Sequence, residues 1–196
     1  MSKPDYLLWC DIETTGLEPE KDFILEICLV LTTLELEAID WRNFILRPEL
    51  DFNKIKSEVI DMHTANGLWI DVINIGAPLS KVNMDISFWL DKLIPRVTDR
   101  YEKRDLSKVY LAGSSVHFDR SFMKKYKFSF EKEISYRHLD ISVVRTMLKM
   151  WKPEDLWPQI STHRAKDDIF DHIEEAKFYR NVLGLWNPIA PESKGV

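Results

Sequence analysis

Residues 6–12, Tyr-Leu-Leu-Trp-Cys-Asp-Ile, are the stretch that decides the fold class. The run is short, almost entirely apolar and followed by a turn over residues 14–20, a pattern typical of a buried strand. Two more apolar stretches, 23–33 and 41–47, predict a second and a third strand, and Pro48 ends the third. Because short connections join these three strands, they are expected to pair as an antiparallel meander.

The rest of the chain alternates between helical and strand-like patterns. Residues 54–75 combine short helical patches with turn signals such as Asn66-Gly67. The longer predicted elements are helices over 78–93, 117–126, 141–151 and about 165–183, and strands over 109–112 and 136–139. A polar, charged loop is predicted over 98–108. Strands joined through helices add in parallel, so the predicted fold class is α/β, with a mixed sheet of about five strands flanked by helices.

A single domain accounts for the chain. It has 196 residues, of which 45% are hydrophobic and 30% are charged, a composition that favours one soluble globular unit. We expect one domain over residues 1–188 and a flexible tail over 189–196. Apolar runs stay well short of the roughly 18–20 residues that a membrane span needs, and the N-terminus lacks a signal-peptide pattern. Cys10 and Cys28 are interpreted as buried free thiols, which fits a cytoplasmic location.

Charge is unevenly distributed along the chain. The net charge is −5, but residues 96–152 carry 14 basic and 7 acidic side chains, a balance of +7. The overall acidity argues against a protein that grips long duplexes through many phosphate contacts. A local basic face is compatible with a short nucleic acid whose phosphates also meet metal ions. Ordinary charge variation on a solvated surface is the alternative explanation.

Asp11-Ile12-Glu13 stands at the end of the first predicted strand. Side chains two residues apart lie on the same face of a strand, so Asp11 and Glu13 are expected to project together. Two carboxylates that close repel each other and are stable together mainly when a cation lies between them. The alternative is an acidic strand end that faces water.

Two more acidic positions stand near the starts of predicted helices. In His163-Arg-Ala-Lys-Asp-Asp168, which opens the last helix, Asp167 and Asp168 are about 100° apart around the helix axis. Only one of them can face a given site, and the spacing favours Asp168, with His163 reaching over from the preceding loop. Asp119 lies near the start of the helix that follows the fourth strand. Helix capping and interaction with the helix dipole are the alternatives for these acids.

Together these signals place four carboxylates and one histidine at the ends of two strands and two helices: Asp11, Glu13, Asp119, Asp168 and His163. An oxygen-rich set suits a hard cation such as Mg²⁺ or Mn²⁺ rather than a structural zinc ion. Two such ions about 3.5–4 Å apart can activate water and stabilise the leaving oxygen of a phosphodiester. A single histidine beside them suits a general base.

The order Asp-x-Glu, Asp, His-x-x-x-x-Asp resembles that of the DEDDh exonucleases, and several stretches resemble oligoribonucleases in particular. These stretches are residues 11–17, 63–68, 113–122, 136–142, 151–154 and 162–168. The resemblance implies a ribonuclease H-like fold and a 3′→5′ exonuclease that releases nucleoside 5′-monophosphates from short RNA or single-stranded DNA. A DNA proofreading or repair exonuclease, and a catalytically silent nucleic-acid-binding module on the same fold, are the alternatives.

The resemblance also assigns roles to individual residues. The four carboxylates would hold two divalent ions, and His163 would be the base that activates water. The residues implied to contact the substrate are Leu17, His63, Ser115, Tyr136 and Arg137. Tyr136 and Arg137 would reach the substrate across a homodimer interface. Packing within a turn, local hydrogen bonding and an ordinary surface position are the alternatives for these five residues.

Two features depart from oligoribonucleases. Those enzymes resemble one another in carrying a base-stacking Trp shortly before the His-Thr motif, whereas residues 57–62 here contain no aromatic side chain. His117-Phe118 precedes Asp119 in place of small and amide residues, which is closer to the polymerase-proofreading branch. The preference between RNA and DNA therefore stays open in the sequence.

Overall fold

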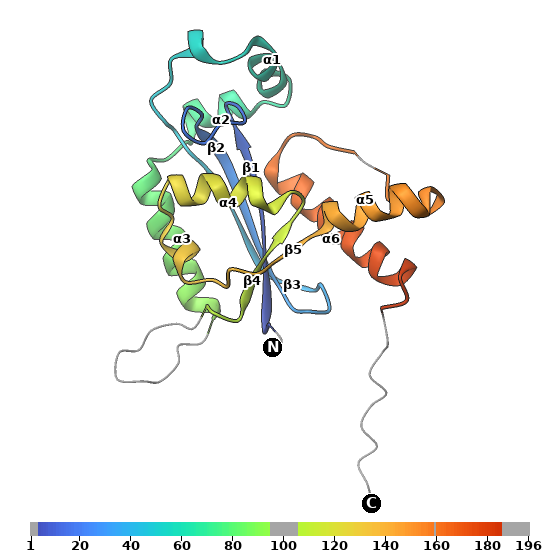
Figure 1. Cartoon of the computed structure of the whole chain (residues 1–196). Coiled ribbons are helices and arrows are strands. Elements are labelled where there is room, and N and C mark those ends of the chain that lie inside the picture. The colour runs from blue at the N-terminus through green and yellow to red at the C-terminus, as the bar shows by residue number, and fades with distance from the viewer. Residues whose placement is uncertain (1–3, 95–105, 159, 186–196) are drawn as a thin grey trace, which may run out of the picture.

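Five strands form one mixed sheet in the order β3-β2-β1-β4-β5 (Figure 1). They are β1 (Tyr6–Thr14), β2 (Ile24–Thr32), β3 (Ala38–Ile45), β4 (Val109–Gly113) and β5 (His138–Asp140). The pairs β1–β2 and β2–β3 are antiparallel, whereas β1–β4 and β4–β5 are parallel. The computed structural model describes residues 4–94, 106–158 and 160–185. The predicted α/β class, antiparallel meander and parallel addition of the later strands are confirmed.

Helices flank this sheet on both faces (Figure 1). The α-helices in the described ranges are α1 (Ser57–Ala65), α2 (Leu68–Asn74), α3 (Leu79–Leu93), α4 (Val116–Lys125), α5 (Ile141–Trp151) and α6 (Ala165–Val182). Short 3-10 helices are η1 (Phe52–Lys54), η2 (Ser129–Lys132) and η3 (Pro153–Asp155). The last four α-helices agree with their predicted ranges to within one residue at each end. None of the helices in the described ranges is long and apolar enough to cross a membrane.

The predicted helical patches of residues 54–75 are α1 and α2. Gly67 separates them in the left-handed backbone region, with φ of 77°, which a residue without a Cβ adopts at little cost. Most of the predicted loop over 98–108 lies outside the described residues, and so does the predicted tail over 189–196.

Apolar side chains cover both faces of the sheet, because successive strand residues point to opposite sides. One face packs against α3 and α4 through a core that includes Leu8, Ile27, Ile86, Leu90 and Phe122. The other face packs against α6 through a core that includes Trp9, Val30, Ile169 and Ile173. Cys10 and Cys28 are free and buried, as predicted, one in each core.

The strand β3 ends the sheet on one side and contacts the helices of both faces. Asp40 accepts a hydrogen bond from the indole of Trp89 in α3 at 2.9 Å. On the opposite face, the Trp41 ring packs edge-on against Phe170 of α6, with centroids 6.0 Å apart. The pairing of β3 with β2 is also interrupted by a register shift near the end of β2. Side-chain contacts from two layers therefore hold this edge strand in place.

The central strand β1 brings the predicted site residues to one end of the sheet. It is the point at which antiparallel pairing on one side gives way to parallel pairing on the other. Because β4 runs parallel to β1, the helix α4 that follows β4 begins at the same edge as the carboxyl end of β1. The strand order also reverses between β1 and β4, and ligands of open α/β sheets bind outside the carboxyl ends of strands at such a reversal.

Candidate active site

Asp11 and Glu13 lie near the carboxyl end of β1, on the same face of the strand. Glu13 is 8% exposed, and burial, with the charges of Asp168 and Glu26, raises its pKa from 4.5 to about 8. Burial, followed by the charge of Asp119, raises the pKa of Asp11 well above its ordinary value. Desolvated carboxylates that repel one another are the groups that a bound cation stabilises.

Asp119 comes from the first turn of α4 and reaches the same end of the sheet. Its side chain is buried, and this burial raises its pKa well above the ordinary value, although a hydrogen bond from the backbone N–H of Ile12 lowers it. The charge of Asp119 is the largest influence on the pKa of Asp11 after burial. The fold therefore brings Asp119 close to the acidic residues of β1.

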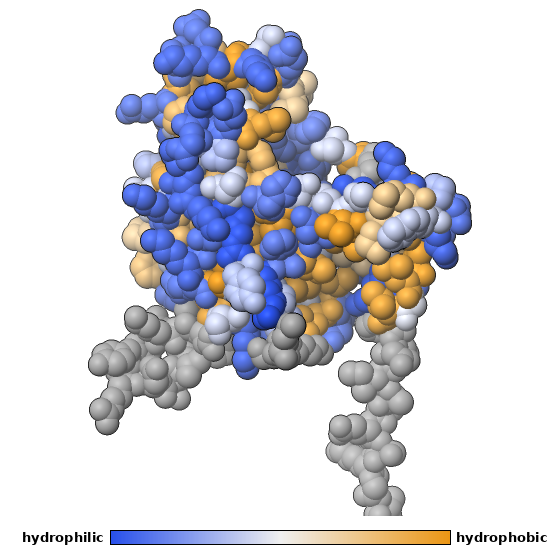
Figure 2. Space-filling view, in the orientation of Figure 1, coloured by the Kyte–Doolittle hydropathy of each residue, from blue (hydrophilic) through white to orange (hydrophobic). Residues whose placement is uncertain are grey.

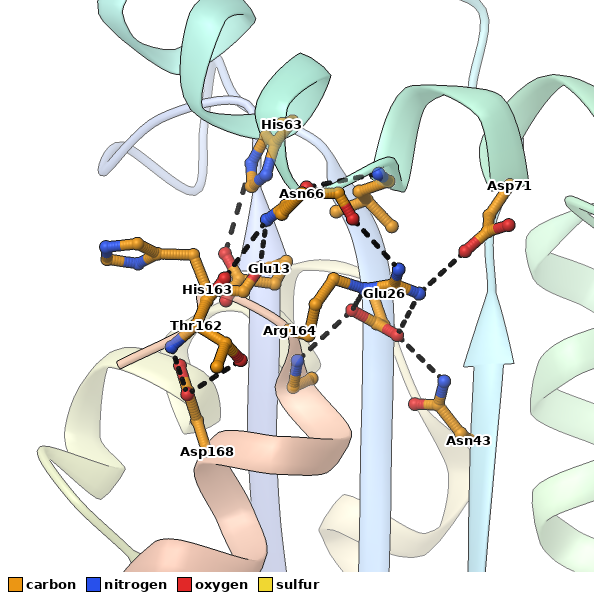
Figure 3. Close-up of polar contacts among 12 residues, drawn as sticks. Glu13, Glu26, Asn43, His63, Asn66, Asp71, Thr162, His163, Arg164 and Asp168 are labelled. Carbon is orange, nitrogen blue, oxygen red and sulfur yellow. Dashed lines mark hydrogen bonds and ion pairs between the residues drawn. The ribbon is translucent and has the colours of Figure 1, made fainter. Parts of the chain in front are cut away.

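His163 and Asp168 flank the start of α6 (Figure 3). Asp168 is buried, and its Oδ1 accepts a hydrogen bond from the backbone N–H of Thr162 at 2.9 Å. One ligand atom each from Glu13, His163 and Asp168 lie within 4.8 Å of one another. Asp167 is exposed, so the choice of Asp168 over its neighbour agrees with the helical geometry. The two carboxylates could hold a metal ion, with the His163 imidazole beside it.

His172 is a residue near the site that the sequence reasoning missed. It follows Asp168 by one helical turn, and its Nδ1 lies 4.0 Å from Oδ1 of Asp11. Burial lowers the pKa of His172, so the neutral imidazole is favoured. An Asp and a His four residues apart share one face of a helix, and this spacing was the available signal.

Asp140 is a second missed residue, and it acts on the start of α4. Its two carboxylate oxygens accept the backbone N–H groups of Ser115 and Val116, each at 3.0 Å. Ser115 has φ of 60° and precedes the helix, so Asp140 supplies the cap that the Ser115 side chain does not. No local pattern reveals this contact, because the partners are 24 and 25 residues apart.

The residues predicted to contact substrate lie in different environments. Leu17 is 78% exposed and lines a cleft of about 780 Å³ together with Glu13 and His163. Tyr136 is 75% exposed, and the Arg137 guanidinium lies 4.9 Å from the centre of its ring. Leu17 and Tyr136 are therefore open to a ligand, and Arg137 is half-buried.

His63 differs from its predicted role, because its side chain is fully buried. Its Nε2 lies 3.1 Å from the carbonyl oxygen of Thr14 and 3.9 Å from Oε2 of Glu13. The hydrophobic surroundings include Trp69, whose ring packs edge-on against the imidazole. In this structure His63 therefore supports the end of β1 from behind instead of facing a nucleotide.

The fold and the site together define a class of protein. A helix-flanked mixed sheet with clustered carboxylates and an exposed histidine at the carboxyl end of its central strand is the arrangement of a metal-dependent nuclease. The exonuclease family RNase T matches residues 8–176. The chain belongs to this family of metal-dependent enzymes and is a 3′→5′ exonuclease, with a nucleic acid as its substrate.

Similar proteins support this membership along nearly the whole chain. The oligoribonuclease of Colwellia psychrerythraea is 31% identical over 181 residues, which cover 90% of this chain and 94% of that enzyme. The oligoribonuclease of Wigglesworthia glossinidia brevipalpis is 35% identical over 182 residues, which cover 90% of this chain and 92% of that enzyme. Among solved structures, the zinc-bound complex of Escherichia coli exonuclease I with single-stranded DNA has a TM-score of 0.67 at 17% identity. That match covers 93% of this chain but 42% of exonuclease I, and it confirms the predicted ribonuclease H-like fold.

Proposed function

We propose that this exonuclease degrades short RNA from its 3′ end and releases nucleoside 5′-monophosphates. The similarity to oligoribonucleases over 90% of the chain supports the choice of substrate. The observation that carries the proposal is the grouping of Glu13, His163 and Asp168 within 4.8 Å. A silent binding module would not need an exposed imidazole beside buried carboxylates, whereas phosphodiester hydrolysis requires both charge stabilisation and proton transfer.

The acidic residues fit divalent metal ions. Burial and the charges of neighbouring carboxylates raise the pKa values of Asp11, Glu13 and Asp119, and oxygen ligands of this kind suit Mg²⁺ or Mn²⁺. We assign the ligands of two ions to Asp11, Glu13, Asp119 and Asp168. When bound, such ions offset the negative charge that develops on the phosphodiester oxygens.

His163 is placed to take a proton from the attacking water. Its side chain is exposed, whereas Glu13 and Asp168 beside it are buried. A neutral imidazole accepts a proton readily near physiological pH. The buried carboxylates therefore hold the ions, and the exposed imidazole of His163 transfers the proton.

The cleft beside the site suits an unpaired terminal nucleotide. Its apolar lining includes Leu17, Val59, Met62 and Phe118, and Lys21, Lys54 and Lys56 bring positive charge to it. An unpaired base can contact the apolar side chains with its face and with all of its edges, whereas in a base pair the Watson–Crick edge is already occupied. The lysines attract the phosphates of a short strand. Val59, Met62 and Phe118 provide apolar surface although residues 57–62 lack an aromatic side chain.

RNA and DNA ladders of about 2 to 20 nucleotides test the proposed substrate. We expect 5′-labelled RNA to shorten by one nucleotide at a time, with the shortest RNAs degraded fastest and EDTA stopping the reaction. A circular single strand is the matched control and should stay intact, because it has no free end. Cuts in the circle would contradict an exonuclease. Faster degradation of DNA than of RNA at every length would instead support the alternative of a DNA exonuclease.

We further propose that the working unit is a homodimer. Tyr136 is exposed and the half-buried Arg137 stacks on its ring, and both are residue types that are enriched at interface hot spots. Hydrophobic surface also gathers over α5 and the C-terminal end of α6 (Figure 2). The exposed apolar residues there are Val143, Met147, Met150, Trp151, Leu183 and Leu185. A second copy that covered this surface would place a planar guanidinium where it could bind a substrate phosphate.

Mixing two inactive variants tests whether neighbouring subunits share a site. Asp11→Ala removes a carboxylate, and Arg137→Ala removes the guanidinium that we expect to act on the partner's site. A mixed dimer regains one complete site, so random exchange should restore about a quarter of the wild-type kcat. The measurement is turnover of a dinucleotide after subunit exchange. A monomer in sedimentation that turns over dinucleotides fully would contradict the proposal.

We also propose a cytoplasmic location and one domain over residues 1–188. The two free, buried thiols fit a reducing compartment. The family match over residues 8–176 fits one exonuclease domain.

A further inference from the structure

His163 has a backbone conformation that needs support from its surroundings. Its φ is 52°, in the left-handed region that costs energy for a residue with a side chain. The imidazole is exposed, so burial of the side chain does not fix its place. The ring has a long contact of its own, with Nδ1 3.4 Å from the Ser161 hydroxyl, so the contacts of the surrounding backbone do most to determine where the imidazole lies.

Asn66 ties this backbone to the corner between α1 and α2 (Figure 3). Its Nδ2 donates hydrogen bonds to the carbonyl oxygens of His163 and, at 3.5 Å, of Thr162. Its Oδ1 accepts a hydrogen bond from the backbone N–H of Leu68 at 3.1 Å. Because both ends of the amide are engaged, the direction in which Asn66 donates is fixed.

Arg164, the next residue after His163, fixes the other side of the loop. Its Nε and Nη2 each lie 3.1 Å from one carboxylate oxygen of Glu26, the bidentate arrangement that gives the strongest and most directional ion pairs. Nη2 also donates to Asp71 at 2.7 Å, and Nη1 donates to the backbone carbonyl of Asn66 at 3.3 Å. Arg164 thus joins the same α1–α2 corner to the sheet.

Glu26 anchors this network in the sheet. It is fully buried on β2 and lies opposite Glu13 in the strand pairing. Besides Arg164, it accepts the backbone N–H of Ala165 at 3.1 Å and the side-chain amide of Asn43 at 2.8 Å. A buried charge with all these partners resists movement, because breaking any of them leaves a desolvated group unpaired.

We infer that Asn66, Arg164 and Glu26 are positioning residues that hold the His163 imidazole beside Glu13 and Asp168. This inference rests on the proposed role of His163 as the base. A loosened loop would misplace the imidazole, while Asp11, Glu13 and Asp119 stay in place because they lie on β1 and α4. Misplacement of a reacting group by about 1 Å can cost about 100-fold in rate, so the effect is expected in kcat and not in metal binding.

Asn66→Asp is the sharpest test, because it replaces the donor by an oxygen and keeps the acceptor for Leu68. We expect kcat to fall about 10- to 100-fold, with KM and the affinity for Mn²⁺, measured by electron paramagnetic resonance, within about 2-fold of wild type. Asn66→Ala, which removes the donor without adding charge, should show the same pattern. In a His163→Ala background neither substitution should lower kcat further, because the group that they position is gone.

Asn83 on α3 offers a matched control. Its Nδ2 donates at 3.3 Å to the carbonyl of Lys127, whose φ is 54°, and its Oδ1 accepts from the backbone N–H of Ser129 at 3.0 Å. Asn83→Asp therefore disturbs the same kind of contact away from the site. It should change Tm about as much as Asn66→Asp, while kcat stays at the wild-type value.

Three outcomes would overturn the inference, and they are distinguishable. Asn66 variants with wild-type kcat, alongside a slow His163→Ala protein, would remove the positioning role and leave the base in place. If Asn66→Ala lowers kcat by the same factor in the His163→Ala background as in the wild type, Asn66 acts on the fold in general and not through His163. A His163→Ala protein with wild-type kcat would overturn the assignment of the base, and the inference with it.

Discussion

Alanine in place of Asp11, Glu13 or Asp168 is expected to lower kcat by about 1,000-fold or more, because each change removes oxygen ligands that hold charge-stabilising ions. Asp167→Ala is the matched control, since Asp167 adjoins Asp168 but is exposed, and its kcat should stay within about 2-fold of wild type. The measurement is single-turnover hydrolysis of a short RNA in Mg²⁺ and in Mn²⁺. Wild-type turnover in any of the three alanine variants would contradict the two-ion site.

The carboxylates that activity requires are expected to lower the stability of the metal-free protein. The pKa of Glu13 is raised to about 8 in the folded protein by burial and by neighbouring carboxylates. Between about pH 4.5 and 8 the Glu13 carboxyl is therefore protonated in the folded state but ionised in the unfolded state. The free energy of unfolding of the metal-free protein consequently falls as pH rises through this range. Glu13→Gln removes this penalty, and its metal-free Tm at pH 8 should exceed that of wild type. Added Mg²⁺ should raise Tm in wild type more than in the variant.

The second large effect is expected for His163→Ala, which should lower kcat about 100- to 10,000-fold if the residue is the general base. Mn²⁺ affinity and KM should change little, because the imidazole is exposed and the carboxylates remain. Loss of a general base removes its contribution to the pH dependence of the rate, so kcat should depend on pH differently in the wild type and in the variant. The measurement is kcat across pH with both proteins. Matching pH profiles would assign the base to another group.

Much of the fold could be predicted from local patterns. The apolar runs around Trp9 and Leu29 and the helical spacing around Ile86 and Ile173 reflect which side chains are buried, and burial determines the periodicity of both element types. The break between α1 and α2 was also predicted locally, from the turn signal Asn66-Gly67. The contacts of the Asn66 side chain with a loop 96 and 97 residues away were not, because no local pattern indicates them.

The grouping of the candidate residues could be predicted where spacing along one element places side chains on one face. Asp11 and Glu13 follow the two-residue period of a strand, and the choice of Asp168 over Asp167 follows the helical period. Contacts between distant elements gave no such signal. His63 was expected to meet a nucleotide, but the packing of α1 against the end of β1 buries it. At such positions the packing of neighbouring elements decides whether a side chain is exposed, and the residue type alone does not.

The edge strand β3 bears on how the protein behaves when it is concentrated. An uncovered edge offers unpaired backbone groups that a second molecule can extend into a larger sheet, which is a common start of aggregation. Here the edge carries the charged pair of Asp40 and Arg42, whose side chains meet at 2.9 Å, and the register shift at β2 and β3 twists the strand locally. Lys166 of α6 also lies 4.6 Å from the centre of the Trp41 ring. A positive charge is therefore placed beside the largest apolar side chain of the edge strand. Such an edge disfavours pairing with a strand of another molecule.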